Sequence, residues 1–224
     1  MDLKRIEDIA RREMATRREP NFREPGWILH HGRRVGRIAA HLARELRLPC
    51  HPDLLYAAGL FHDIAKGRER HNEAGAELTG RLLADLLTAT ELADVTEAIR
   101  LHNQRGRDGD LPDAVRLIQD ADVLDHAGFV EVWLTFYWHG HHGETFADHE
   151  AWLAGQEYAR HHAYMAAHLN YEASRRLLAR RQAWAERFYA DFHHIYREGV
   201  DGELDEDRRD ADGPPPGTGG GTPD

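Results

Sequence analysis

Apolar residues recur at intervals of three and four along most of the chain, which is the spacing of one face of an α-helix. Between residues 28 and 47, for example, Val35, Ile38, Leu42 and Leu46 share such a face. Alternation of apolar and polar residues with a period of two, as in a half-buried strand, does not persist in the sequence. The pattern therefore predicts an all-α protein.

Prolines and glycines mark where the predicted helices begin and end. Pro52 suits the first turn of a helix that should run to about Lys66, because Gly67 is a natural stop. The two glycines within 139–143 predict a break, and the amphipathic run after residue 156 predicts one long C-terminal helix. The expected helices cover residues 2–18, 28–47, 52–66, 71–88, 91–103, a segment opened by Pro112, 129–138, 146–154 and 156–197.

Composition separates the end of the chain from the rest. Residues 201–224 are acidic and then rich in glycine and proline, with almost no apolar side chains to bury. We therefore expect 201–224 to be disordered. Residues 1–200 have a length that suits one core, so we expect a single helical domain there, with a long C-terminal helix.

Charge and cysteine usage exclude several classes of protein. The 224 residues include 29 basic and 39 acidic side chains, a net charge of −10, which disfavours non-specific nucleic-acid binding. Apolar runs fall far short of the roughly 18 residues that span a membrane, and the charged first residues predict no signal peptide. Cys50 is the single cysteine, so we expect no internal disulfide, no Cys-based zinc site and a cytoplasmic location.

Candidate chemistry centres on histidine, of which the chain has 17. His62 and Asp63 stand together at the end of an apolar predicted helix. A charged carboxylate near a core costs several kcal/mol unless it is paired or binds a metal. Imidazole and carboxylate together suit divalent ions such as Mn, Fe, Mg, Ni or Zn, so this pair is a candidate metal site.

Three short motifs lie on three different predicted helices: His31-Gly-Arg-Arg34-Val35, His62-Asp63 and Asp120-Ala-Asp122-Val-Leu-Asp125. In this order they resemble the HD-domain superfamily of metal-dependent phosphohydrolases, over about residues 28–127. The resemblance implies an HD-type helical bundle that holds one divalent ion. The implied ligands are His31, His62, Asp63 and Asp122.

Asp120 and Asp122 are two residues apart, so on a helix they point in well-separated directions. Only one of them can be the main ligand. The resemblance favours Asp122, and it leaves Asp120 and Asp125 as candidates for supporting the ligands.

The resemblance also implies catalytic roles for four residues. Asp63 would both bind the ion and orient water, Lys66 would offset phosphate charge, and His71 and His102 would contact phosphate or shuttle protons. In two-metal members of the superfamily, histidines at such positions complete a second site instead. Candidate substrate-binding arginines are Arg34, Arg70 and Arg105, with Arg68 and Arg107 nearby; Arg34 could equally form a structural ion pair.

The expected function is hydrolysis of a phosphate ester or phosphoanhydride of a small nucleotide by metal-activated water. One ion per chain is favoured, with Mn, Mg, Ni, Co, Fe and Zn all open. One alternative is a two-metal enzyme that acts on dinucleotides or, if loaded with iron, runs oxygen chemistry. Another is a nucleotide-binding regulator without turnover. The aromatic segment 129–138 is expected in the core, with a base-stacking wall as the alternative.

Overall fold

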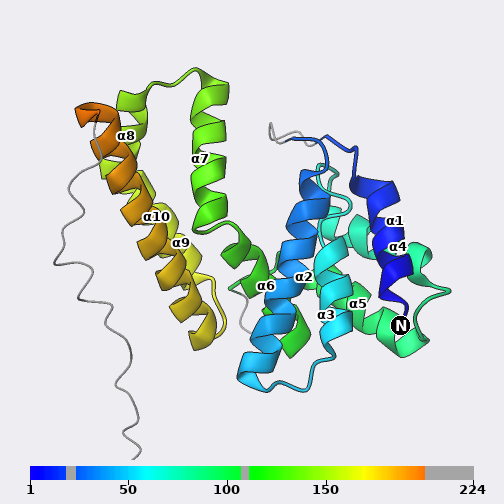
Figure 1. The fold of residues 1–224 in the computed structure, drawn as a ribbon. Coiled ribbons are helices and arrows are strands. Elements are labelled where there is room, and N and C mark those ends of the chain that lie inside the picture. Colours follow the sequence, from blue (N-terminus) through cyan, green and yellow to red (C-terminus); the bar gives the residue numbers. More distant parts are fainter. Residues whose placement is uncertain (19–23, 107–110, 200–224) are drawn as a thin grey trace, which may run out of the picture. The chain divides into compact units, whose positions relative to one another are not determined.

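The computed structural model describes residues 1–18, 24–106 and 111–199, and these residues form ten α-helices and no strand (Figure 1). The helices are α1 (Leu3–Met14), α2 (Trp27–Leu46), α3 (Pro52–Phe61), α4 (His71–Leu83), α5 (Ala89–Leu101), α6 (Asp113–Asp125), α7 (Phe129–His142), α8 (Phe146–Ala154), α9 (Gln156–Ala167) and α10 (Glu172–Glu198). The predicted all-α class is confirmed for this part of the chain. The expected disorder of 201–224 lies outside the described residues.

The described chain separates into two compact units, one over residues 1–185 and one from residue 186 onward. The first unit contains α1 to α9 and the first half of α10. The described part of the second unit is the remainder of α10. The single domain over residues 1–200 stays a prediction. Across all described residues, none of the helices combines the length and the apolar character needed to cross a bilayer.

Two of the predicted boundaries in the C-terminal half are wrong. The expected break at 139–143 begins only at the end of that range, because α7 continues to His142 and stops at Gly143, whose φ of 68° is left-handed. The expected single helix over 156–197 is divided into α9 and α10. The carboxylate of Asp120 accepts the backbone N–H of Asn170 at 2.7 Å and of Tyr171 at 3.1 Å. These two residues lie between α9 and α10, and their N–H groups therefore bond to Asp120 instead of continuing the helix.

Close contact between α2 and α3 positions the candidate site. A Cβ on Gly32 would lie 2.4 Å from the carbonyl oxygen of Leu60, and a Cβ on Gly59 would lie 2.4 Å from the nitrogen of Gly36. Only glycine allows two helices to approach so closely at these positions. The contact brings His31 of α2 next to the residues that follow α3.

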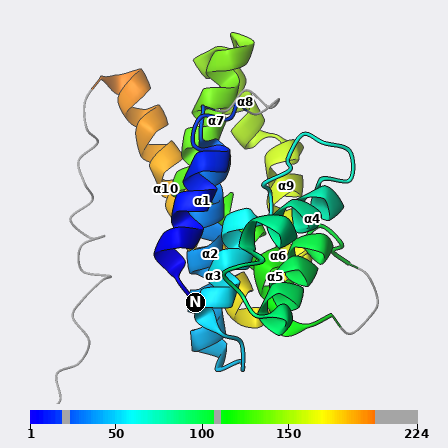
Figure 2. The same ribbon diagram turned by 90° about the vertical axis from the view of Figure 1, so that its right-hand side faces the viewer.

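Helix α1 lies beside α2 and α3 (Figure 2). Its apolar face buries Ile6 and Met14 completely. On its polar side Glu7 accepts hydrogen bonds from Arg33, with Nε at 2.9 Å, and from the hydroxyl of Tyr56. The expected N-terminal helix is therefore part of the same bundle as the motif-bearing helices.

Candidate metal centre

Asp125 fixes the ring of His31 through its Nδ1 atom. Its Nδ1 lies 2.7 Å from Oδ2 of Asp125, and because a carboxylate only accepts, Nδ1 donates. Arg34 donates to both oxygens of the same carboxylate, at 2.7 Å and 2.9 Å. The fixed tautomer leaves Nε2 of His31 as the atom that faces the other candidate ligands.

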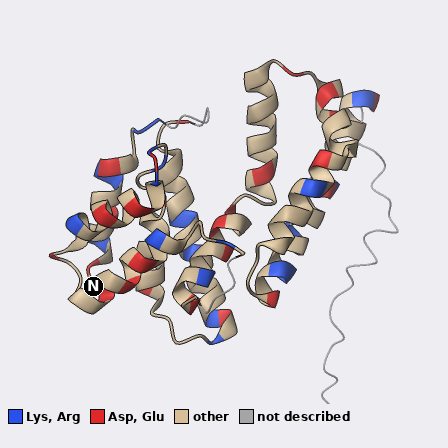
Figure 3. Cartoon of the chain, turned by 180° about the vertical axis from the view of Figure 1, so that it is seen from behind, with Lys and Arg blue, Asp and Glu red and all other residues tan. Residues whose placement is uncertain are grey.

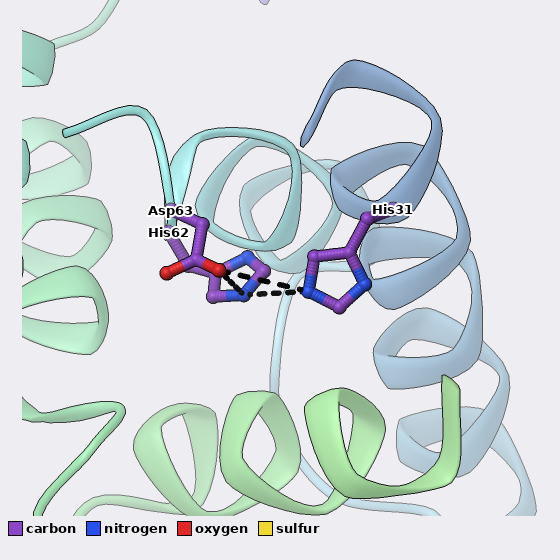
Figure 4. Close-up of side chains that lie close together, drawn as sticks. All are labelled: His31, His62 and Asp63. Atoms are coloured by element: carbon purple, nitrogen blue, oxygen red, sulfur yellow. Dashed lines mark hydrogen bonds and ion pairs between the residues drawn. The ribbon is translucent and has the colours of Figure 1, made fainter. Parts of the chain in front are cut away.

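The candidate ligands converge from α2, from α6 and from the turn after α3. Nε2 of His31 lies 3.2 Å from Nε2 of His62, 3.2 Å from Oδ1 of Asp122 and 3.9 Å from Oδ2 of Asp63. Nε2 of His62 lies 3.7 Å from that Asp63 oxygen and 3.6 Å from that Asp122 oxygen. Figure 4 shows how His31, His62 and Asp63 point toward one common position.

These separations fit a bound ion. Metal bonds of about 2.0–2.2 Å place adjacent ligand atoms about 3 Å apart. The Nδ1 of His62 donates a hydrogen bond to the carbonyl of Gly59 at 2.8 Å. Its Nε2 is therefore directed toward the other candidate ligands. His31 and His62 are 2% and 0% exposed, so their donor atoms face protein. The two imidazoles and two carboxylates thus suit one divalent cation.

The turn that carries Asp63 is fixed from outside the site. After α3 ends at Phe61, residues 62–66 form successive turns, with Lys66 N donating to Asp63 O at 2.8 Å. The guanidinium of Arg17 donates to the carbonyls of Ile64 and Lys66 in this turn. The predicted helix to Lys66 therefore ends earlier, and the site uses the turn instead.

Electrostatics of the cluster keep its carboxylates ionised. Burial opposes ionisation of Asp63 and Asp122, but His62 and Lys66 beside Asp63, and His31 and His62 beside Asp122, hold both pKa values well below the usual range. Burial opposes the charged form of His31, yet Asp122 and Asp125 outweigh it and raise its pKa to about 9. The buried carboxylate of Asp63 and the half-buried carboxylate of Asp122 are thus both ionised, and His31 balances part of their charge.

Asp63 links two groups of histidines. Its Oδ2 faces His31 and His62, while its Oδ1 lies 3.5 Å from Nε2 of His71 and 3.7 Å from Nε2 of His102. Burial lowers the pKa of His71, and burial together with nearby His62 lowers that of His102 to about 4. Both imidazoles are therefore neutral at pH 7 and can act as hydrogen-bonding groups or as ligands.

Two basic groups lie directly on the centre. Nζ of Lys66 is 3.0 Å from Oδ2 of Asp63. The guanidinium of Arg105 pairs with Oδ2 of Asp122. Arg34, by contrast, pairs with Asp125. Of the two roles that the sequence allowed for Arg34, substrate binding and a structural ion pair, this contact is the ion pair.

Other residues singled out in the sequence lie elsewhere. The Asp120 carboxylate accepts hydrogen bonds from Asn170 and Tyr171, in the segment before α10, which places Asp120 in the framework of the fold. Arg70 is exposed and pairs with Glu73. Arg68 is exposed, and Arg107 lies outside the described residues.

His126 is a member of the centre that sequence reasoning missed. Its Nδ1 donates to the carbonyl of Asp122 at 2.9 Å, and its ring centre lies 5.0 Å from that of His31. With His31 and Asp122 it forms a further group able to hold an ion. The signal was present, because residues four apart on a helix share a face.

A cavity of about 990 Å³ begins at this centre. Arg105, Asp122 and His126 line its inner end, and its other walls come from α7, α8 and α9. A space of this size is within the usual range for a small-molecule site.

Comparison with known proteins agrees with the fold. Residues 28–127 match the family model of the HD domain, and this range contains all four candidate ligands. In sequence, the chain matches none of the proteins of curated function.

Several solved structures share the architecture. A predicted HD superfamily hydrolase from an uncultured Thermotogales bacterium is 22% identical, with 87% of this chain and 92% of that chain covered and a TM-score of 0.60. An HD-superfamily hydrolase from Bacillus thuringiensis is 20% identical, with 88% and 99% covered and a TM-score of 0.61. Bacillus subtilis YpgQ, solved in complex with ADP, is 16% identical, with 89% and 97% covered and a TM-score of 0.57. At these identities the likeness shows the fold alone.

Proposed function

Because the chain carries an HD domain over residues 28–127, we propose that it is a divalent-metal-dependent phosphohydrolase that cleaves a phosphate ester or phosphoanhydride of a small nucleotide. One observation carries this proposal. The donor atoms of His31, His62 and Asp122 come from α2, the turn after α3 and α6, and they lie 3.2–3.6 Å from one another.

The residues around the centre have the properties that the reaction needs. A divalent ion held by His31, His62, Asp63 and Asp122 would lower the pKa of a bound water and polarise a phosphate oxygen. Lys66 would offset phosphate charge from its place beside Asp63, and Arg105 would do so from beside Asp122. His102, with its pKa near 4, keeps Nε2 available to accept a hydrogen bond or a proton.

Support for a nucleotide comes from two sources. The similar fold of YpgQ was solved in complex with ADP. The cavity that begins at Asp122 also has tryptophan and tyrosine side chains in its walls, and aromatic faces bind nucleobases by stacking. The net charge of −10 favours a small molecule over a nucleic-acid polymer, and the single cysteine suits the cytoplasm.

A two-metal enzyme is the second candidate, and one observation favours it. Oδ1 of Asp63 points to Nε2 of both His71 and His102, which with Asp63 form a further group able to hold an ion. In that case Asp63 would bridge two ions. A dinucleotide would then become a candidate substrate.

The direct test is product release from a panel of nucleotides by protein loaded in turn with Mn²⁺, Mg²⁺, Ni²⁺ and Co²⁺. We expect the wild type to release phosphate or pyrophosphate. Asp63→Asn should abolish this release, whereas Asp85→Asn, at an exposed position on another segment, should not change it. Failure of every metal-loaded sample to hydrolyse any nucleotide would overturn the proposal and favour a regulator without turnover.

A further inference from the structure

The turn that carries Asp63 offers two of its carbonyls to a side chain from α1's end of the chain. Inside the turn, the backbone N–H groups of Ile64, Lys66 and Arg68 donate to the carbonyls of Phe61, Asp63 and Ala65, at 3.0, 2.8 and 3.1 Å. The alternating carbonyls, those of Ile64 and Lys66, accept the guanidinium of Arg17 through its Nη1 and Nη2 atoms. One planar group therefore bonds two points of the same turn, which the single ammonium of a lysine is not shaped to do.

This turn needs support from outside because of its own hydrogen bonds. Each of them joins residues three apart, and such bonds have poorer geometry than those of an α-helix. Yet the turn holds Asp63, which is 5% exposed, and Lys66, whose Nζ lies 3.0 Å from Oδ2 of Asp63. Arg17 grips the chain directly after the first of these residues and at the second. The placement of a candidate ligand and of its neighbouring ammonium thus depends on Arg17.

The backbone of Arg17 is tied to the start of α2. Its carbonyl accepts the N–H of Gly26 at 3.0 Å, and its own N–H donates to the carbonyl of Met14 at 3.3 Å. Gly26 has a φ of 80°, and a Cβ there would lie 2.6 Å from the carbonyl oxygen of Ala15, so α2 begins directly against the end of α1. His31 follows in the second turn of α2. Arg17 therefore contacts both segments that supply the histidine ligands.

Helix α1 is a firm base for this residue. Ile6, Ala10 and Met14 are completely buried on its apolar face. Its Glu7 accepts hydrogen bonds from Arg33 of α2 and Tyr56 of α3, the two helices that lie beside it (Figure 2). Because α1 is packed on both neighbours, the guanidinium that follows it is held in place with respect to them.

We propose that Arg17 is a positioning residue for the metal centre: its side chain holds the turn of Asp63 and Lys66, and its backbone holds the start of the helix that carries His31. The inference rests on the proposed function and extends it to α1, which supplies none of the candidate ligands. Loss of the guanidinium should loosen the turn, weaken metal binding as a result, and slow hydrolysis.

The first test follows backbone hydrogen exchange by mass spectrometry, in the peptide that contains residues 62–68. The full chain is first stripped with a chelator, because a bound ion would itself hold Asp63. Arg17→Met removes the guanidinium and keeps an apolar stem, so exchange in this peptide should be about fivefold faster or more. Unchanged exchange in this variant would overturn the proposal.

The control for this test is Arg12→Met. Helix α1 carries several other basic residues (Figure 3), so a general effect of lost positive charge must be separated from the effect of Arg17. Arg12 is an exposed residue of the same helix, and its replacement should leave exchange in residues 62–68 as in the wild type. Equally fast exchange in both variants would assign the effect to charge and overturn the proposed contact.

The second test measures Mn²⁺ affinity by competition with a chelator. Arg17→Met should bind the ion about 10- to 100-fold more weakly, as expected for a residue that orients a ligand. Arg17→Lys keeps the charge and lacks the planar pair of donors, so it should also bind more weakly than the wild type. Wild-type affinity in Arg17→Lys would show that the two carbonyl contacts are not required, which contradicts the proposal.

Glu7→Gln separates positioning from general stability. It weakens the contacts of α1 with Arg33 and Tyr56 and leaves the Arg17 side chain in place. We expect it to lower the stability of the fold and to keep the wild-type affinity for Mn²⁺. If its affinity falls as far as that of Arg17→Met, metal binding follows overall stability and Arg17 has no specific role.

These measurements distinguish the inference from the proposed function. Faster exchange and weaker Mn²⁺ binding in Arg17→Met, in a protein that hydrolyses no nucleotide, would retain the positioning role and reject the phosphohydrolase. Hydrolysis by the wild type, with wild-type exchange and Mn²⁺ affinity in Arg17→Met, would retain the phosphohydrolase and reject the positioning role.

Discussion

Asp125 fixes the orientation of His31, since its Oδ2 accepts the Nδ1 proton at 2.7 Å. The Asp125 side chain is completely buried, so its charge depends on that bond and on the two bonds from Arg34. These contacts hold its pKa at about 2 despite burial. The pair therefore keeps Nε2 of His31 pointed at the candidate ion position.

Asp125→Asn should weaken metal binding without removing a ligand. The amide has no charge to balance Arg34, and it orients His31 less firmly, so we expect metal affinity to fall about 10- to 100-fold. Competition with a chelator measures this affinity. Asp85→Asn, at an exposed position, is the control, and equal affinity in both variants would show that Asp125 does not support His31.

Asp120→Asn should lower the stability of the fold and leave metal binding unchanged. Its carboxylate accepts the backbone N–H groups of Asn170 and Tyr171 at 2.7 and 3.1 Å, so an amide at this position would lose part of these charge-assisted bonds. We expect the free energy of unfolding to fall by about 2 kcal/mol, as measured by denaturant titration, with unchanged metal content. Loss of metal from a protein of normal stability would instead assign Asp120 to the centre.

Gly59→Ala should be strongly destabilising because α2 and α3 touch at this position. The added Cβ would lie 2.4 Å from the nitrogen of Gly36, so the helices must separate. We expect a loss of about 3 kcal/mol or more. Gly80→Ala on α4 is the contrast, because its Cβ would meet only a Thr96 methyl at 3.7 Å and helix propensity should add up to about 1 kcal/mol. Similar unfolding midpoints for the two variants would contradict this account of the contact.

Glu7→Gln should give a stability loss that depends on pH. Burial raises the pKa of Glu7, but the hydrogen bonds from Arg33 and Tyr56 outweigh it and hold the pKa below its ordinary value of 4.5. A carboxyl whose pKa is lower in the folded state stabilises the protein above the unfolded pKa and loses this effect as the pH falls. The variant should be less stable by about 1 kcal/mol at pH 7, with the difference shrinking below pH 4.5. Denaturant titrations at several pH values test this, and a difference that stays constant down to pH 3 would be inconsistent with it.

The sequence predicted most of the helices because apolar periodicity is a local property of the chain. The division between α9 and α10 escaped prediction because Asp120, about 50 residues away, holds Asn170 and Tyr171. The break expected from residue 139 begins only at Gly143, since Gly140 is tolerated inside α7 and Gly143 adopts a left-handed φ.

The candidate ligands were named from motifs, whereas their support was visible only in three dimensions. The three-residue spacing in the sequence places Arg34 near His31 on one helix. It could not show that Asp125, 91 residues after Arg34, pairs with both side chains. His126 could have been found four residues after Asp122, on the same helix face. The link from Asp63 to His71 and His102 required the turn after α3 to be seen.

The most direct test of the metal centre is the number of metal ions per chain, measured by elemental analysis of protein without a histidine tag. We expect one equivalent in the wild type and in His41→Ala, an exposed control on α2, and none in His62→Ala or Asp122→Ala. Two equivalents in the wild type would add His71 and His102 to the ligands. A wild type without metal, or a metal content unchanged in both variants, would contradict the centre described here.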